Sequence, residues 1–167
     1  MSYHDDPELM ERLYAAFRAT PLHALLGIEF ADDPATADIS DPSAEVVVKM
    51  PVRAEAYGSS GNLHGGAIAT LIDVAAASAA ARNSNFEPGK NTLVTADLHV
   101  RYLGRPHGDM VFAHAKVIRA GRQLVVVECR VIDSEDRIIA VADFASMVVP
   151  LRQPLPGATH DPGSPEL

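Results

Sequence analysis

The chain has no tryptophan, only 5% aromatic residues and a single cysteine, and its 14 Lys and Arg are outnumbered by 22 Asp and Glu. One cysteine cannot form an internal disulfide, and Cys129 stands in an apolar run where a buried small side chain is expected. The net charge of −8 argues against a non-specific nucleic-acid binder, which needs clustered Lys and Arg for its phosphate contacts. No Cys and His cluster has zinc-site spacing, so no metal is expected.

Targeting signals and membrane-spanning runs are also missing. The N-terminus is acidic where a secretory signal would be basic, and no apolar segment follows it. The longest stretch of uncharged residues, 65–81, consists mostly of small side chains and is interrupted by Asp73, which makes it too weak for a membrane span. We therefore expect a cytoplasmic protein with no membrane partner. Its 167 residues, 47% of them hydrophobic, suffice for the core of one domain.

The first third of the chain predicts one helix and two strands. Apolar residues at helical spacing indicate an amphipathic helix over residues 7–20, which Pro21 ends. A strand is expected over residues 25–30, followed by a polar, Pro- and Asp-rich turn region over 31–43. A second strand over residues 44–50 is closed by Pro51.

The rest of the chain predicts a long helix followed by an antiparallel meander. The helix, residues 64–82, is almost entirely apolar and small, so it must be covered on most sides. Four strands follow, over residues 91–102, 110–120, 124–132 and 138–149. This plan is an α+β domain in which one antiparallel β-sheet wraps a central α-helix. We assign residues 1–149, with the N-terminal helix, to this single domain, and residues 150–167 to a Pro-rich, loosely ordered tail.

The strand over residues 91–102 alternates along its length. Strict alternation places Thr95 on one face with Asp97, His99 and Arg101, opposite a face formed by Val94, Ala96, Leu98, Val100 and Tyr102. A face with Asp, His and Arg is typical of a solvated or interface surface.

The start of the long helix has the chemistry of an anion site. Gly65 and Gly66 leave backbone N–H groups unshielded at a helix N-terminus, where the helix dipole adds partial positive charge. Such a terminus can hold an oxyanion or polarise a carbonyl group. The alternative is that Asn62 caps the helix and the glycines only permit a tight turn.

Asp73 is the second candidate group, because it is the only ionisable residue between Gly65 and Ala81. Aspartate has poor propensity for a helix interior, and a carboxylate among apolar residues needs a hydrogen-bonding partner or a role. Apolar surroundings would make it a stronger base or nucleophile. The alternative is an aspartate on a solvent-facing strip or at a subunit seam.

These motifs resemble a known family. The His64-Gly65-Gly66 motif, Asp73 nine residues after the histidine, and the strand Val94–Tyr102 are similar to the hotdog-fold acyl-CoA thioesterases of the phenylacetate-pathway (PaaI-like) type. The similarity covers roughly residues 20–149. The resemblance implies a hotdog fold, a homodimer or dimer of dimers with active sites at the subunit interface, and hydrolysis of an acyl-CoA thioester. It implies no cofactor, since coenzyme A is part of the substrate.

The resemblance also implies roles for individual residues. Gly65 would donate its N–H to the thioester carbonyl, and Asp73 of the opposite subunit would act as general base or as nucleophile. Thr95 would help to hold the water. Gly66 belongs to the same substrate-binding motif, and His64 would position the substrate loop, unless it is a capping or packing histidine.

One position departs from the family pattern. Members often carry Asn six residues before the motif histidine, where this chain has Gly58. Asn62, two residues before His64, is the residue that could take over this role. Gly58 therefore keeps open a second hypothesis, a non-catalytic acyl-CoA-binding or sensor protein on the same fold.

Basic residues for the CoA phosphates are sought in the less acidic part of the chain. Residues 82–137 hold 9 basic and 7 acidic side chains, whereas residues 1–81 hold 4 and 12. Arg122, in a predicted hairpin turn, is the first candidate for the phosphates.

Overall fold

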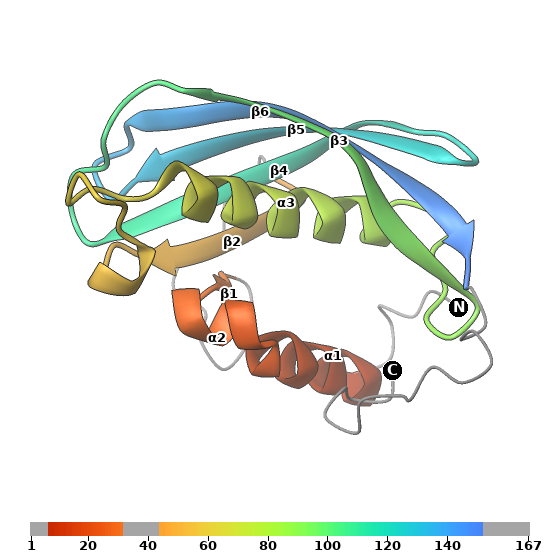
Figure 1. The fold of residues 1–167 in the computed structure, drawn as a ribbon. Helices are drawn as coiled ribbons and strands as arrows, with labels where there is room; N and C mark the ends of the chain where they lie inside the picture. Colours follow the sequence, from red (N-terminus) through yellow and green to blue (C-terminus); the bar gives the residue numbers. More distant parts are fainter. Residues whose placement is uncertain (1–6, 32–43, 152–167) are drawn as a thin grey trace.

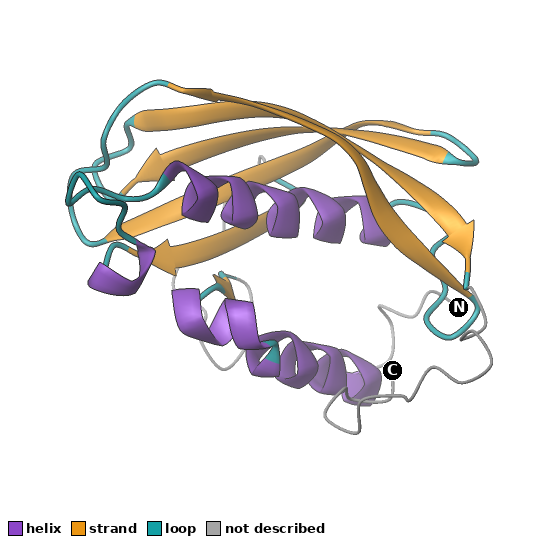
Figure 2. Ribbon diagram, in the orientation of Figure 1, coloured by secondary structure: helices purple, strands orange, loops and turns teal. Residues whose placement is uncertain are grey.

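A computed structural model describes residues 7–31 and 44–151, and these form one curled antiparallel sheet around a long helix (Figures 1 and 2). The sheet curls over one side of the helix α3 (Gly65–Arg82), and two short helices lie across its other side. The predicted α+β hotdog architecture is confirmed. Among the described residues, no helix is long and apolar enough to cross a membrane.

The N-terminal segment forms two helices rather than a helix and a strand. Helix α1 (Pro7–Ala19) is followed at once by α2 (Pro21–Leu26), and strand β1 is only Glu29–Phe30. The prediction of a strand from residue 25 was wrong, because Pro21 begins a helix instead of only ending one. Gly27, with φ of 67°, adopts the left-handed conformation that ends α2.

The sheet contains six strands in the order β1-β2-β4-β5-β6-β3, with antiparallel pairing throughout. The remaining strands are β2 (Val46–Pro51), β3 (Asn91–Tyr102), β4 (Met110–Ala120), β5 (Leu124–Asp133) and β6 (Ile138–Pro150). A 3-10 turn, Ala54–Ala56, leads from β2 toward α3. These bounds match the predicted meander to within one or two residues, because each strand is bounded by a turn sequence.

The core lies between α3 and the concave face of the sheet. Four alanines of α3 are fully buried, namely Ala75, Ala76, Ala79 and Ala80. Their small side chains let the backbone of α3 lie close to the strands, where Phe144 and Leu71 fill the remaining space. Cys129 is buried in this core, and desolvation raises the pKa of its thiol to about 12.

A β-bulge in β3 overturns the predicted alternation. The register between β3 and β6 shifts between Thr95 and Asp97, so Ala96 is left without a partner. Thr95 therefore faces α3 together with Tyr102, instead of sharing the outer face with Asp97. The extra residue reverses the side on which every residue before it would lie under strict alternation.

Two predictions fall outside the described residues. The Pro-rich tail is described only to residue 151, and residues 32–43 of the predicted turn region are likewise not described. The division into a domain of residues 1–149 and a tail of residues 150–167 stays a prediction.

The buried alanines of α3 generate a stability prediction. Ala76→Leu adds methylene groups where the sheet leaves no room, so it should lower the free energy of unfolding by about 1–3 kcal/mol. The matched control is Ala15→Leu on the exposed side of α1, where the change should stay within about 0.5 kcal/mol. Urea denaturation of both variants checks this, and equal stabilities would contradict the tight contact.

Candidate active site

The N-terminus of α3 is capped by His64. The Gly66 N–H donates to Nδ1 of His64 at 2.8 Å, and the N–H groups of Ala67 and Ile68 donate to the His64 carbonyl. The Gly65 N–H has no acceptor among the described residues. Gly65 is therefore the one donor of the first helical turn that a ligand oxygen can use.

The His64 ring lies between two glycines. A Cβ atom at Gly66 would lie 2.9 Å from Nδ1 of His64, and one at Gly58 would lie 3.0 Å from Cδ2. The imidazole thus occupies the space that a side chain at position 58 would need. Because Nδ1 accepts a hydrogen bond, the proton of the neutral ring is assigned to Nε2.

Asn62 closes the preceding loop and does not cap the helix. Its Nδ2 donates to the Ser60 carbonyl at 3.0 Å, and its own carbonyl accepts from the Gly58 N–H at 2.8 Å. The alternative in which Asn62 is the N-cap is therefore wrong. His64 takes that position because its imidazole has room between two residues without side chains.

Asp73 is half-buried and has a defined partner across the helix–sheet boundary. The Thr95 hydroxyl donates to Oδ1 of Asp73 at 2.8 Å, which the bulge at Ala96 makes possible. Oδ2 has no hydrogen bond among the described residues. The arrangement is a carboxylate held by one oxygen and open at the other, which suits proton abstraction or nucleophilic attack.

Gly65 and Asp73 cannot act together within one chain. They lie eight residues apart on the same helix, which is about 12 Å along its axis. Tyr102 lies beside the first of them, with its hydroxyl donating to the Gly65 carbonyl at 3.0 Å. Thr95 lies beside Asp73, so β3 runs antiparallel to α3.

Ser146 is a buried polar residue beside the candidate site that the sequence analysis did not single out. It pairs directly with Thr95 across β3 and β6, and its hydroxyl is buried without a hydrogen-bond partner in the described part of the chain. The sequence contained a signal for this position. Alternation along β6 places Ser146 on the same face as the inward-facing Ala140, Ala142 and Phe144. A polar side chain in an inward row of apolar residues indicates a function or a bound water.

Arg122 is not near Gly65 of its own chain. It lies in the exposed turn between β4 and β5, at the opposite end of the sheet from the N-terminus of α3 (Figure 1). Leu124 begins β5 directly after this turn, whereas Val131 lies toward the other end of the strand, level with Tyr102 across the sheet. The two residues are seven positions apart along β5, which is about 23 Å. The structure thus brings Thr95 to Asp73 and His64 to Gly66, and leaves Arg122 apart.

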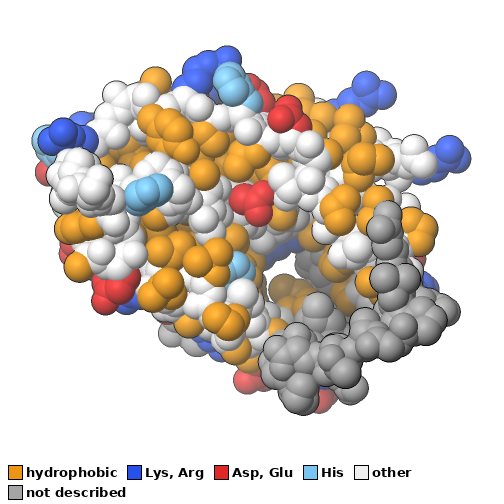
Figure 3. Space-filling model, in the orientation of Figure 1, with side chains coloured by type: hydrophobic (Ala, Val, Ile, Leu, Met, Phe, Trp, Pro, Cys, Tyr) orange, Lys and Arg blue, Asp and Glu red, His pale blue; other side chains and the backbone are white. Residues whose placement is uncertain are grey.

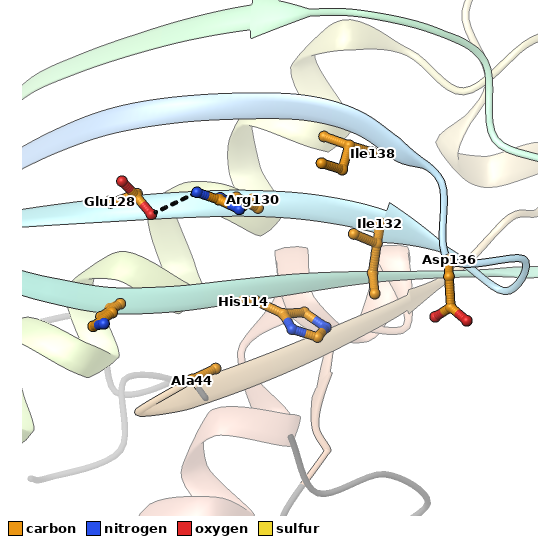
Figure 4. A pocket seen from close by; sticks show the side chains of 8 residues that line it. Ala44, His114, Glu128, Arg130, Ile132, Asp136 and Ile138 are labelled. Atoms are coloured by element: carbon orange, nitrogen blue, oxygen red, sulfur yellow. Dashed lines mark ion pairs between the residues drawn. The ribbon is translucent and has the colours of Figure 1, made fainter. Parts of the chain in front are cut away.

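A hollow of about 410 Å³ lies on the outer face of the sheet, away from α3 (Figure 4). Its lining includes Lys116, Arg130 and Ile132, and an ion pair of 3.3 Å joins Arg130 to Glu128. None of the candidate catalytic residues lines it. Within the described residues, no group of His, Cys, Asp or Glu side chains is arranged to hold a metal ion.

Comparison with known sequences finds a family model that matches part of the chain. Residues 60–140, which contain the capped glycines, Asp73 and Thr95, match the sequence model of the Thioesterase superfamily. This segment is similar to the Thioesterase superfamily. A Halobacterium salinarum protein, provisionally named an esterase, is 40% identical to this chain over 76 residues. That match covers 46% of this chain and 49% of the relative, so the chain spans about half the length of this relative.

Solved structures share the fold. A mutant thioesterase of Pseudomonas aeruginosa is 25% identical, with a TM-score of 0.71 and coverage of 84% of this chain and 94% of that one. A thioesterase of Haemophilus influenzae, 23% identical, covers 89% of this chain and 93% of its own at a TM-score of 0.69. A Bacillus halodurans protein solved with CoA is 26% identical, covering 84% and 80%, at a TM-score of 0.64.

The contact between His64 and Gly66 generates a prediction. Gly66→Ala should displace the imidazole and remove the cap, whereas Gly65→Ala meets Tyr102 only at an ordinary 3.4 Å. Both gain helix propensity, so Gly66→Ala should be less stable than Gly65→Ala by about 0.5–2 kcal/mol. Thermal and urea denaturation measure this difference.

The control is the same pair of substitutions in a His64→Ala background. With no ring to displace, Gly66→Ala should no longer be the less stable variant. A difference that persists there would contradict the role of the imidazole.

Proposed function

We propose that this protein hydrolyses an acyl-CoA thioester to a free acid and CoA, as its similarity to the Thioesterase superfamily suggests. The observation that carries the proposal is the hydrogen bond from Thr95 to Asp73, whose carboxylate is the only ionisable group of α3 between Gly65 and Ala81. The free N–H of Gly65 supplies the second requirement, a donor for an oxyanion. The reaction needs no cofactor.

The general-base form of the reaction uses the open oxygen of Asp73. Oδ2 accepts a proton from water while the water oxygen adds to the thioester carbonyl carbon. The carbonyl oxygen becomes an oxyanion, which the Gly65 N–H and the dipole of α3 stabilise. The tetrahedral intermediate then expels the CoA thiolate, which takes the proton from Oδ2 of Asp73, and the acid is released.

The nucleophilic form uses the same oxygen differently. Oδ2 attacks the carbonyl carbon, the CoA thiolate leaves, and a mixed anhydride joins the acyl group to Asp73. Water then hydrolyses the anhydride and restores the carboxylate. In both forms, Thr95 fixes the direction of Oδ2 by holding Oδ1 at 2.8 Å.

The active site combines two chains. The separation of about 12 Å between Gly65 and Asp73 excludes a single-chain site for one carbonyl group. β3 is an edge strand with an unpaired side among the described strands, and residues 94–97 along it are exposed. An antiparallel second copy along β3 would bring its Thr95 and Asp73 to the Tyr102 and Gly65 of the first. The proposed assembly is therefore a homodimer, which a dimer of dimers can extend.

His64 and Asn62 shape the substrate loop, and Arg122 is the proposed phosphate contact. The proton assigned to Nε2 of His64 makes this ring edge a donor beside Gly58, the position at which the family resemblance often implies Asn. In the antiparallel dimer, the β4–β5 turn with Arg122 approaches the Gly65 end of the partner chain. The CoA in the Bacillus halodurans structure supports a ligand of this class.

Asp73→Asn tests the function. It keeps the size of the side chain and the partner for Thr95 but removes the base, so kcat for CoA release should fall at least about a hundredfold. The assay is a panel of acyl-CoA thioesters with a thiol-reporting dye, in which the buried Cys129 gives no background in the folded protein.

Asp109→Asn, an exposed aspartate outside the site, is the matched control and should keep wild-type turnover. Circular dichroism shows whether both variants fold. Wild-type turnover in Asp73→Asn would remove Asp73 from the mechanism. Binding of acyl-CoA by the wild-type protein without any CoA release would instead favour the non-catalytic binding function.

The dimer has its own test. With the unpaired Ala96 left out, the midpoint between Thr95 and Tyr102 falls at His99, so the proposed two-fold axis passes near this residue. His99→Cys should therefore give a disulfide-linked dimer under oxidation, since the two thiols face each other across the axis. Gln123→Cys, in the exposed β4–β5 turn, is the control and should stay uncrosslinked. A monomer mass for the wild-type protein in light scattering would contradict the shared site.

A further inference from the structure

A second cavity lies between α1 and the C-terminal half of α3, on the side of α3 that the sheet leaves open. Its volume is about 170 Å³, and Figure 3 shows a hollow between these two helices. The lining is mostly hydrocarbon and aromatic: Met10, Leu13 and Phe17 from α1, Ala81 from α3, and Phe30 and Phe86.

Helix α1 presents an apolar face to this cavity. Met10, Leu13 and Phe17 repeat at spacings of three and four residues, which places them on one side of the helix. α1 is anchored at one end, where the Phe17 and Phe30 ring centroids lie 4.2 Å apart. Between that anchor and α3, the apolar face of α1 borders the cavity, so its side chains lack part of their dispersion contacts with the other described residues.

The polar side chains of the lining already have partners within the protein. The Ser78 hydroxyl donates to the Val74 carbonyl at 2.7 Å, and Arg82 donates to the Tyr14 hydroxyl at 3.4 Å. Arg82 also donates to the Glu45 carbonyl at 3.4 Å. An occupant therefore meets hydrocarbon surface and no polar group that needs a partner, which favours an apolar occupant over a polar one.

The cavity is in line with the proposed nucleophile or base. Asp73, Ala77 and Ala81 follow each other at intervals of four residues, so they form one row along α3. Ala81, at the end of the row, lines the cavity and lies about 12 Å along the axis from Asp73. The only side chain of the row between them is the small one of Ala77.

We infer that this cavity receives the hydrocarbon end of a medium-chain acyl group whose carbonyl carbon lies at Asp73. The inference rests on the proposed function and names its substrate class. A volume of about 170 Å³ holds about six groups of the size of a water molecule, and dry apolar cavities bind hydrocarbon ligands. Acetyl and butyryl groups do not reach the cavity from Asp73, whereas a decanoyl group does.

Binding of non-hydrolysable thioethers tests the cavity separately from catalysis. Calorimetry compares decyl-CoA with ethyl-CoA on the wild-type protein, on Ala81→Leu and on the exposed control Ala15→Leu. Each methylene group that enters the cavity should raise affinity about fourfold. The wild-type protein and Ala15→Leu should therefore bind decyl-CoA more than a hundredfold tighter than ethyl-CoA, and Ala81→Leu should lose at least tenfold of that ratio.

A second variant covers the case in which Ala81→Leu does not fold. Leu13→Ala enlarges the cavity, so the tightest-binding thioether should shift from decyl-CoA toward dodecyl-CoA. Equal affinity of the wild-type protein for ethyl-CoA and decyl-CoA would overturn the inference, whatever the hydrolysis rates are. A ratio that both variants leave unchanged would also overturn it. A chain-length ratio that depends on Ala81, without CoA release from any thioester, would support the cavity and refute the hydrolase.

Discussion

The close contact between the alanine face of α3 and the curled sheet is the constraint on which the rest of the structure depends. Ala75, Ala76, Ala79 and Ala80 are fully buried against the strands, so no polar side chain can lie on that side of the helix. Asp73 must then project toward the rim of the sheet, where β3 ends the strand order. The packing of the core therefore determines where the carboxylate of Asp73 lies.

Because α3 is a single rigid element, it also separates the two halves of the proposed chemistry. The N–H of Gly65 belongs to its first turn and the carboxylate of Asp73 to its middle, at a fixed distance that no side-chain rotation can remove. β3 repeats this separation, since Tyr102 accompanies the first group and Thr95 the second. This fixed separation is the reason that the proposed site combines groups of two chains.

The sequence was sufficient for the elements that depend on local patterns. The apolar helix over residues 64–82 and the four following strands were predictable, because hydrophobic periodicity and turn residues mark their ends. The bulge at Ala96 was not, since it depends on the register with β6, a strand some 50 residues later. The start of α2 was missed for a different reason, because Pro21 suits both the end of one helix and the first turn of the next.

The site shows the same division. Asp73 stood out as a lone charge, and His64, Gly65 and Gly66 as a motif. The place of the His64 ring between Gly58 and Gly66 depends on how a loop folds back, which no local pattern encodes. In the sequence, Gly58 was notable only for lacking the expected Asn side chain. In the structure, its lack of a side chain makes room for the His64 ring.

The unpaired Ala96 divides β3 into two parts in which the alternation of side chains is opposite. Residues before it and residues after it obey opposite rules for which side faces the helix. An insertion or deletion of one residue in this strand therefore exchanges the solvent-facing and helix-facing side chains on one side of the bulge only. In a set of related chains, alignment gaps near position 96 would thus carry more information about activity than the identity of the residue that fills them.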